Sequence, residues 1–169
     1  QEPVCLLGTA LAFLHFLDNC QETRQHFSLA SGSRIMDTGG YKGTSRQLPQ
    51  TELHKLYERI LGISPGSVVN EYGMSELCTQ FYDNSLREPG KTRCKLVPPW
   101  ARTLIIDPET METLPKGQVG LIRHYDLANR GSAMAVQTDD LGVEIDNGFE
   151  ILGRAPGAMS RGCSIAIDE

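Results

Sequence analysis

The pattern of hydrophobic and polar positions in the first half of the chain predicts alternating strands and helices. Short apolar runs at residues 3–7, 33–38 and 68–69 are typical of buried strands. Residues 10–17 and 51–61 separate these runs, and their apolar positions recur at helical spacing. The order strand, helix, strand, helix, strand predicts an α/β unit with a mainly parallel sheet.

Capping and turn residues mark where these elements begin and end. Thr9 precedes the first helix and can cap it, and Gly62 follows the second and can end it. After the third strand, Asn70 and Gly73 interrupt the apolar run. We expect a third helix to begin at Ser75.

The second half of the chain has a different pattern. Residues 85–95 are charged and contain a Pro-Gly pair, which indicates a connection between two lobes. Beyond it, residues 103–106 are typical of a strand, and Asp-Asn-Gly at 146–148 predicts a hairpin. We therefore expect an α/β domain over residues 1–84 and a small β-rich, distorted barrel-like lobe over residues 85–169.

Charge and hydropathy exclude some classes of partner. The net charge of −5 is spread without long runs, so nothing indicates a nucleic acid or an acidic membrane surface as a partner. No apolar run approaches the roughly 20 residues that span a bilayer, and no signal peptide is visible. Because the first residue is Gln1 and not methionine, we expect the chain to be an excised piece.

The cysteines and histidines show no metal-ligand spacing. The cysteines are odd in number and form no C-x-x-C pair, which favours reduced thiols in a cytoplasmic protein. Cys78 is expected to be a small buried side chain, and the four scattered histidines are expected to be structural or surface residues. The five cysteines are Cys5, Cys20, Cys78, Cys94 and Cys163.

The stretch from Ser67 to Asp83 concentrates chemistry in one turn. A loop between a strand and a helix start presents backbone N–H groups that suit a phosphate. Tyr72 adds a flat ring, Ser75 a hydroxyl and Glu76 an oxygen ligand of the kind that magnesium takes. Together these groups could hold a magnesium nucleotide. The alternative is a capped helix after a strand, with a core tyrosine and ordinary residues in the first turn.

The pattern N-x-Y-G-x-S-E from Asn70 to Glu76 resembles a signature of the adenylate-forming superfamily, which includes acyl-CoA ligases, peptide-synthetase adenylation domains and luciferases. The resemblance implies ATP and Mg²⁺ as cofactors. It places Tyr72, with Gly73 beside it, against adenine. It also implies that Ser75 reaches the α-phosphate and that Glu76 binds magnesium.

Later motifs occur in the order that this superfamily has. Residues 114–122 resemble its P-x-G-x-x-G-x-[LI] hairpin, and residues 137–142 resemble T-G-D-L-G, with Asp139 where glycine is usual. The resemblance implies that Asp140 accepts hydrogen bonds from the ribose hydroxyls and that Arg154, in a Gly-Arg pair, lies near the ribose and phosphates. The alternative for the two aspartates is a solvated turn.

Two segments are similar to the acyl-protein synthetases of the bacterial fatty acid reductase of luminescence. Gly39 and Gly40 resemble a glycine pair that borders the acyl pocket; the alternative is a simple turn. Residues 153–164 resemble the end of those enzymes, where a cysteine carries the acyl group. Cys163 takes that place, and Arg161 could lower its pKa. A packed strand residue is the alternative for Cys163.

The chain also departs from the superfamily pattern. The upstream phosphate loop is missing, Pro156 stands where many members have a hinge aspartate, and no small domain with a catalytic lysine follows Glu169. The resemblance therefore implies the C-terminal half of a large domain, inactive without the phosphate loop. A CoA-ligase cycle by domain rotation is in doubt.

The expected function is ATP-dependent activation of a fatty acid, or another small carboxylic acid, as acyl-AMP, followed by transfer to a protein thiol. Ser75, Glu76 and Cys163 are the expected catalytic residues, and a reductase is an expected acyl acceptor. An acyl- or aryl-CoA ligase of the phenylacetate type is the first alternative. A non-catalytic AMP- or ATP-binding module and a purely structural fragment are the others, and a homo-oligomer is left open.

Overall fold

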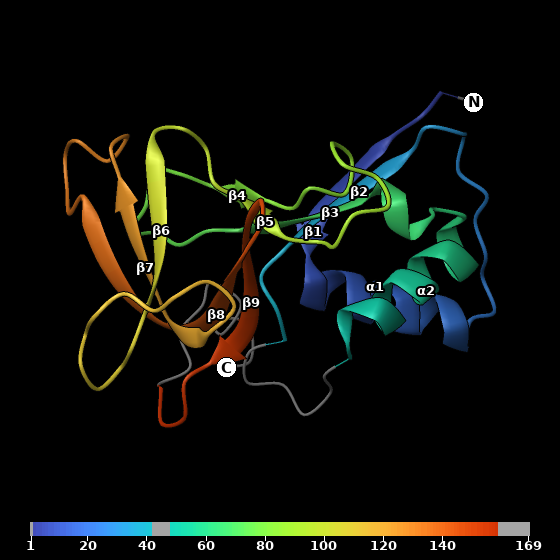
Figure 1. Cartoon of the computed structure of the whole chain (residues 1–169). Helices are drawn as coiled ribbons and strands as arrows, with labels where there is room; N and C mark the ends of the chain where they lie inside the picture. The colour runs from blue at the N-terminus through green and yellow to red at the C-terminus, as the bar shows by residue number, and fades with distance from the viewer. Residues whose placement is uncertain (1, 42–47, 159–169) are drawn as a thin grey trace. The chain divides into compact units, whose positions relative to one another are not determined.

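The computed structural model describes residues 2–41 and 48–158. This part of the chain divides into two compact units (Figure 1). Of the described residues, the first unit includes 2–41, 48–71 and 85–91, and the second includes 72–84 and 92–158.

The first unit is built on parallel strands. β1 (Cys5–Thr9), β2 (Arg34–Thr38) and β3 (Val68–Tyr72) lie in the order β1-β2-β3, and both pairs are parallel. Parallel neighbours need a crossover connection, which α1 (Ala10–Glu22) and α2 (Gln50–Leu61) supply. Figure 1 shows the two helices beside each other on one side of these strands. The predicted α/β unit is confirmed.

Local sequence determines where both helices begin or end. Thr9 accepts a hydrogen bond from the N–H of Ala12 at 3.1 Å, so the predicted N-cap is present. Gly62 ends α2 in the left-handed conformation, with φ of 70°, which glycine adopts without strain. Apolar side chains from the strands and from both helices form the core of this unit. They include Phe13, Leu17, Ile35, Leu53, Tyr57, Ile60 and Val68.

The second unit is β-rich, as predicted, but its bounds differ from the expected ones. It includes Tyr72–Asn84, which were expected in the α/β domain, whereas Ser85–Lys91 belong to the first unit. Five of its strands form an antiparallel sheet in the order β5-β9-β8-β7-β6. Phe81, Ile105, Ile122 and Phe149 are buried at its core. Its strands are β4 (Phe81–Tyr82), β5 (Lys95–Leu96), β6 (Ala101–Ile106), β7 (Val119–Asp126), β8 (Ala135–Ile145) and β9 (Gly148–Arg154).

The helix expected to begin at Ser75 is absent, and residues 73–80 form a loop with a turn at Ser75 and Glu76. The cause lies far away in the chain, because the N–H groups of Cys78 and Thr79 donate to the carboxylate of Asp126. In a helix that began at Ser75, the N–H of Thr79 would bond to the carbonyl oxygen of Ser75, so its bond to Asp126 replaces a helical one. Cys78 is exposed, so the prediction that it is buried was wrong.

The hairpin predicted at residues 146–148 is confirmed, but its glycine has another purpose. Ile145 pairs with Gly148 across a two-residue turn, and Gly148 already belongs to β9. A Cβ at Gly148 would lie 1.9 Å from the carbonyl oxygen of Lys95. Glycine is therefore needed for the close approach of β5.

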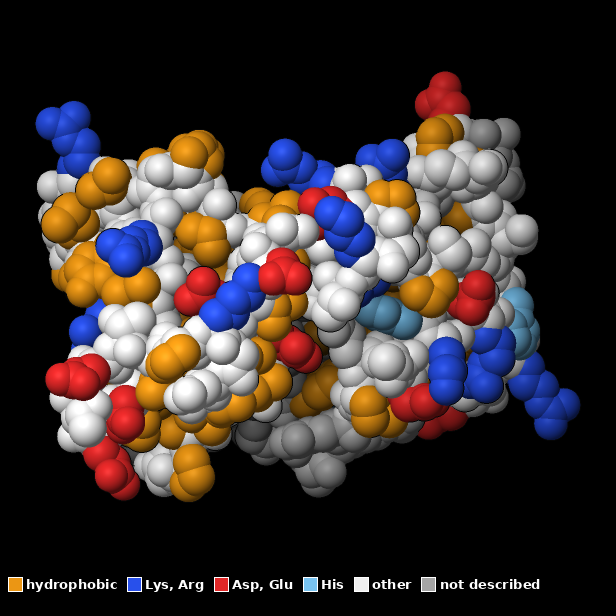
Figure 2. Space-filling model, viewed as in Figure 1, with side chains coloured by type: hydrophobic (Ala, Val, Ile, Leu, Met, Phe, Trp, Pro, Cys, Tyr) orange, Lys and Arg blue, Asp and Glu red, His pale blue; other side chains and the backbone are white. Residues whose placement is uncertain are grey.

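Neither of the two helices in the described part of the chain is long and apolar enough to cross a bilayer. On the face that Figure 2 shows, Lys and Arg side chains are spread among acidic, apolar and uncharged ones.

We expect the substitution Gly148→Ala to lower the free energy of unfolding by about 1–3 kcal/mol, because the added methyl group must push β5 away from β9. Urea denaturation measures this change. Gly131→Ala is the matched control, since no atom lies within 4 Å of a Cβ built there, and it should change stability by less than about 0.5 kcal/mol. Equal midpoints for the two variants would contradict this account of Gly148.

Candidate functional site

The structure brings together Tyr72, Asp140 and Arg154, all in the second unit. The Tyr72 hydroxyl donates to Asp140 Oδ2 at 2.8 Å. Asp140 on β8 and Arg154 at the end of β9 are cross-strand partners, and Arg154 Nη1 lies 3.8 Å from Asp140 Oδ1. Antiparallel pairing of β8 and β9 therefore juxtaposes an acid and a guanidinium that stand 14 positions apart in the chain.

Burial determines the charge state of Tyr72. Burial, and then the nearby Asp140 carboxylate, raise the pKa of Tyr72 well above its ordinary value, so the phenol stays a neutral donor. The Asp140 side chain is only 14% exposed. Arg154 also donates from Nη2 to Asp139 Oδ2 at 3.1 Å, so Asp139 is not merely solvated. Among the described residues, none accepts from the buried Nε of Arg154.

Gly73, Ser75 and Glu76 lie on the exposed loop that follows Tyr72. The Ser75 hydroxyl donates to Glu76 Oε2 at 3.3 Å, so these two side chains lie together. Within residues 2–41 and 48–158, no group of three or more His, Cys, Asp or Glu side chains is placed to hold a metal ion. Magnesium sites commonly use one or two carboxylates with substrate phosphates, and Glu76 fits that kind of site.

Asp126, which sequence reasoning missed, anchors this loop. It ends β7 with its side chain fully buried. Its Oδ2 accepts from the N–H groups of Cys78 at 2.9 Å and Thr79 at 2.8 Å. Its Oδ1 accepts from the Thr79 hydroxyl at 2.7 Å and the N–H of Ala128 at 3.0 Å. Burial alone would raise the pKa of Asp126, but these hydrogen bonds outweigh burial and hold that pKa below its ordinary value.

Asn129 holds the same loop from a second point. Its Nδ2 donates to the carbonyl oxygen of Glu76 at 2.8 Å and to that of Ala133 at 3.0 Å. The Trp100 indole N–H donates to the Thr79 hydroxyl at 3.1 Å. The sequence offers only a weak signal for this arrangement, namely that Asp126 and Asn129 are polar residues at and just after the end of a strand.

An aromatic cluster supports Tyr72 from within the second unit. His124 is fully buried and stacks on Phe81, with ring centroids 4.6 Å apart, and the centroids of Tyr72 and Phe149 lie 5.8 and 5.6 Å from it. Its Nδ1 lies 3.0 Å from the Thr103 hydroxyl. Burial lowers the pKa of His124 to about 4, and the Asp126 charge opposes this only in part. The ring is therefore neutral near pH 7.

The first unit contains the predicted glycine pair. Gly39 and Gly40 follow β2, and Gly39 has φ of 70°, a left-handed conformation that favours glycine. No atom lies within 4 Å of a Cβ built at either position, so close packing does not require glycine there. Cys163 lies outside the described residues.

Asn70, the first residue of the signature, has a structural contact in the first unit. It donates to Asp37 Oδ1 at 2.6 Å, and the Tyr57 hydroxyl donates to Asp37 Oδ2 at 3.1 Å. Asp37 is buried, and burial together with this carboxylate raises the pKa of Tyr57 well above its ordinary value. These hydrogen bonds connect β2, β3 and α2.

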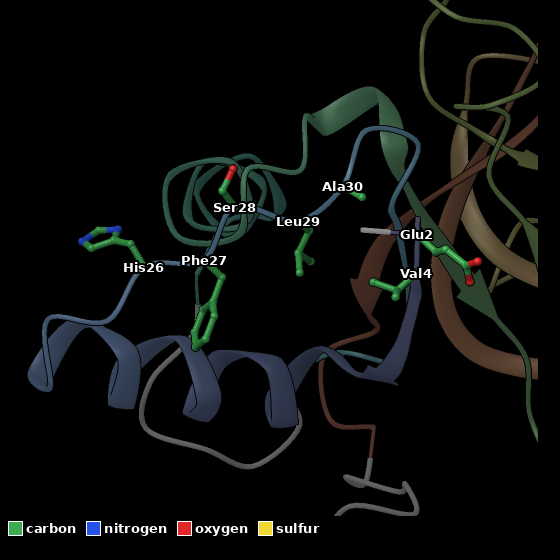
Figure 3. A pocket seen from close by; sticks show the side chains of 7 residues that line it. All are labelled: Glu2, Val4, His26, Phe27, Ser28, Leu29 and Ala30. Carbon is green, nitrogen blue, oxygen red and sulfur yellow. The ribbon is translucent and has the colours of Figure 1, made fainter.

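The first unit also has a surface hollow, which is lined by residues other than those discussed above. Glu2, Val4 and residues 26–30 line it, and Figure 3 shows Phe27 pointing toward α1 and His26 pointing away from the other labelled side chains. Phe27 stacks on Phe16 with ring centroids 6.2 Å apart. The lining includes none of the predicted site residues.

The architecture is that of part of an adenylate-forming enzyme. ATP-bound MatB from Rhodopseudomonas palustris superposes on this chain with a TM-score of 0.62 and 21% identity, over 89% of this chain and 31% of that one. The likeness shows a shared fold, and it confirms the predicted fold class.

The family follows from the sequence comparison. The model of the family "Acyl-protein synthetase, LuxE" matches residues 1–169, and the chain belongs to this family. A long-chain-fatty-acid--luciferin-component ligase from Vibrio harveyi is 28% identical over 98% of this chain and 45% of its own length. The protein of the same name from Aliivibrio fischeri is 22% identical over 99% of this chain and 46% of its length. The chain thus spans about half the length of these relatives.

We expect stability to fall as the pH falls from about 6.5 to about 4. The depressed pKa of His124 means that the unfolded chain binds a proton in this window that the folded chain does not. The contribution is fully present above pH 6.5, and its loss amounts to about 3 kcal/mol by pH 4. Denaturant unfolding at pH 7, 5.5 and 4.5 measures this slope.

The variant His124→Phe should reduce the pH dependence, because phenylalanine keeps the ring contacts but has no titrating group. His15→Phe replaces an exposed histidine and is the control, for which the slope should stay that of the parent. Equal slopes for the parent and His124→Phe would show that His124 titrates normally.

Proposed function

We propose that the protein containing this chain activates a fatty acid with ATP as acyl-AMP and transfers the acyl group to a protein thiol. The observation that carries the proposal is the convergence of Tyr72, Asp140 and Arg154 in one unit. Membership of the acyl-protein synthetase family supports it, as do the fatty-acid ligase names of the two relatives.

The proposed adenosine contacts use the hydrogen-bonding capacity that these side chains still have. Each carboxylate oxygen of Asp140 can accept two hydrogen bonds, so the acid can still accept from both hydroxyls of a ribose while it holds Tyr72. The Tyr72 ring then offers an aromatic surface for adenine. The Nε of Arg154, unmatched among the described residues, can donate to a ribose or phosphate oxygen.

The activation step takes place at the α-phosphorus. A carboxylate oxygen of the fatty acid attacks that atom, the new P–O bond forms, and pyrophosphate leaves. When ATP binds, the Ser75 hydroxyl, which donates to Glu76 in the structure, would turn to donate to the α-phosphate. Glu76 would be the protein ligand for the cation. Mg²⁺ would supply charge stabilisation for the phosphate oxygens in the transition state. Gly39 and Gly40 would border the acyl chain.

The transfer step assigns Cys163 as the acyl acceptor. Its thiolate attacks the acyl carbonyl, a thioester forms and AMP leaves. The thioester can then be passed to an acyl-accepting protein such as a reductase. We assign this chemistry to the cytoplasm, where thiols stay reduced.

The first test is fatty-acid-dependent exchange of ATP with pyrophosphate in the natural full-length protein. Asp140→Ala removes charged hydrogen bonds to the ribose, each worth about 1.5–3 kcal/mol, so we expect kcat/KM for ATP to fall at least about tenfold. Asp146→Ala at the exposed hairpin tip is the control and should leave exchange unchanged. Wild-type exchange in a Glu76→Ala, Asp140→Ala double variant would contradict the assigned roles.

The second test separates a protein thiol from coenzyme A as the acceptor. After incubation with ATP and fatty acid, mass spectrometry should find a thioester on Cys163. The variant Cys163→Ser should keep exchange, because acyl-AMP formation precedes transfer, and should lose the rapidly labelled thioester. Acyl-CoA formation without an adduct on Cys163 would favour a CoA ligase, and AMP binding without exchange would favour a non-catalytic module.

A further inference from the structure

Residues 73–80 form a loop and not a helix. This loop contains Ser75 and Glu76, the side chains assigned to the phosphates and the cation. We propose that Asp126 is a positioning residue, which together with Asn129 holds this loop so that Ser75 and Glu76 meet the phosphates of MgATP. This inference deepens the proposed function and rests on it. Asp126 acts through the loop backbone and does not itself touch the nucleotide.

The hydrogen bonds of Asp126 are those of an anchor. The carboxylate is fully buried at the end of β7 and accepts four hydrogen bonds, three of them from Cys78 and Thr79. A buried charge is tolerated only when its acceptor sites are filled, so the loop backbone must stay in place to keep this one paired. The constraint acts within three residues of Glu76.

Asn129 fixes the other end of the same short segment. Its amide donates to the carbonyl of Glu76, and the second hydrogen of that amide is taken up by Ala133. Neither bond uses the Glu76 carboxylate. Its Oε2 accepts from the Ser75 hydroxyl, and its oxygens have further acceptor sites for a ligand while the backbone is held. Positioning of this kind matters because a misplacement of about 1 Å can reduce a rate by about a hundredfold.

Trp100 fluorescence can report on the hydrogen bonds of Asp126. Trp100 is the only tryptophan of the chain, and its indole N–H donates to the Thr79 hydroxyl, which in turn donates to Asp126 Oδ1. The hydrogen bond from Tyr72 to Asp140 involves none of these residues. Loss of the anchor should therefore change Trp100 emission and the phosphate contacts while the adenosine contacts remain.

The variant Asp126→Asn tests this in the natural full-length protein. An amide keeps the shape of the carboxylate but has one acceptor oxygen, so its NH₂ must face donors that Asp126 now pairs. We expect kcat/KM for ATP in exchange to fall about a hundredfold and the Mg²⁺ concentration needed for half-maximal exchange to rise. Adenosine affinity, measured by calorimetry, should change less than threefold, and Trp100 emission should shift.

Asp107→Asn is the matched control. Asp107 also follows a strand and accepts from two backbone N–H groups, those of Glu109 and Thr110, but this turn bears no assigned residue. This variant should keep exchange, Mg²⁺ dependence and Trp100 emission as in the wild type.

Two results would overturn the proposal. One is wild-type exchange by Asp126→Asn, and the other is an equal loss of adenosine and MgATP affinity, which would indicate a general structural role. A wild-type protein without any exchange contradicts the proposed function. In that case the anchor is judged by binding alone, and Asp126→Asn must still weaken MgATP much more than adenosine.

Discussion

The cross-strand pairing of β8 with β9 is the constraint on which the candidate site depends. It sets Asp140 opposite Arg154, and the Tyr72 hydroxyl then completes a small polar group beside an aromatic core. Because Tyr72 stays protonated, it orients the Asp140 carboxylate without adding charge. A one-residue slip of β9 would turn the guanidinium to the other face of the sheet and separate the group. Gly148, where β5 comes too close for any side chain, belongs to the same pairing.

Buried polar groups organise both units, although the two networks differ. In the second unit, Asp126 satisfies four donors and fixes an exposed loop, while neutral His124 fills space among aromatic rings. In the first unit, the Asp37 carboxylate accepts hydrogen bonds from Asn70 and Tyr57 and so connects two strands and a helix. A buried carboxylate left without its donors costs several kcal/mol, so each network favours one arrangement of its elements.

Family membership and local geometry support the proposed chemistry in different ways. The family match covers residues 1–169 and gives the class of enzyme, whereas the contacts of Tyr72, Asp140 and Arg154 indicate how a nucleotide would be held. The proposed cation site needs one protein carboxylate, that of Glu76, because magnesium commonly binds one or two carboxylates together with substrate phosphates. In the proposed function, Asp126 and Asn129 hold the loop at residues 73–80 in place, and the phosphates of the substrate supply the other ligands of the cation.

The sequence alone determined the elements that depend on neighbouring residues. Apolar periodicity predicted the strand and helix order of the first unit, Thr9 and Gly62 marked helix ends, and ordered motifs indicated the superfamily. Tertiary structure decided whatever depends on distant contacts. A helix was expected at Ser75, but the segment is a loop whose Thr79 and Cys78 N–H groups donate to Asp126, 47 and 48 positions further along the chain. No local pattern contains that partner, because the β-sheet of the second unit must form before the carboxylate meets the loop.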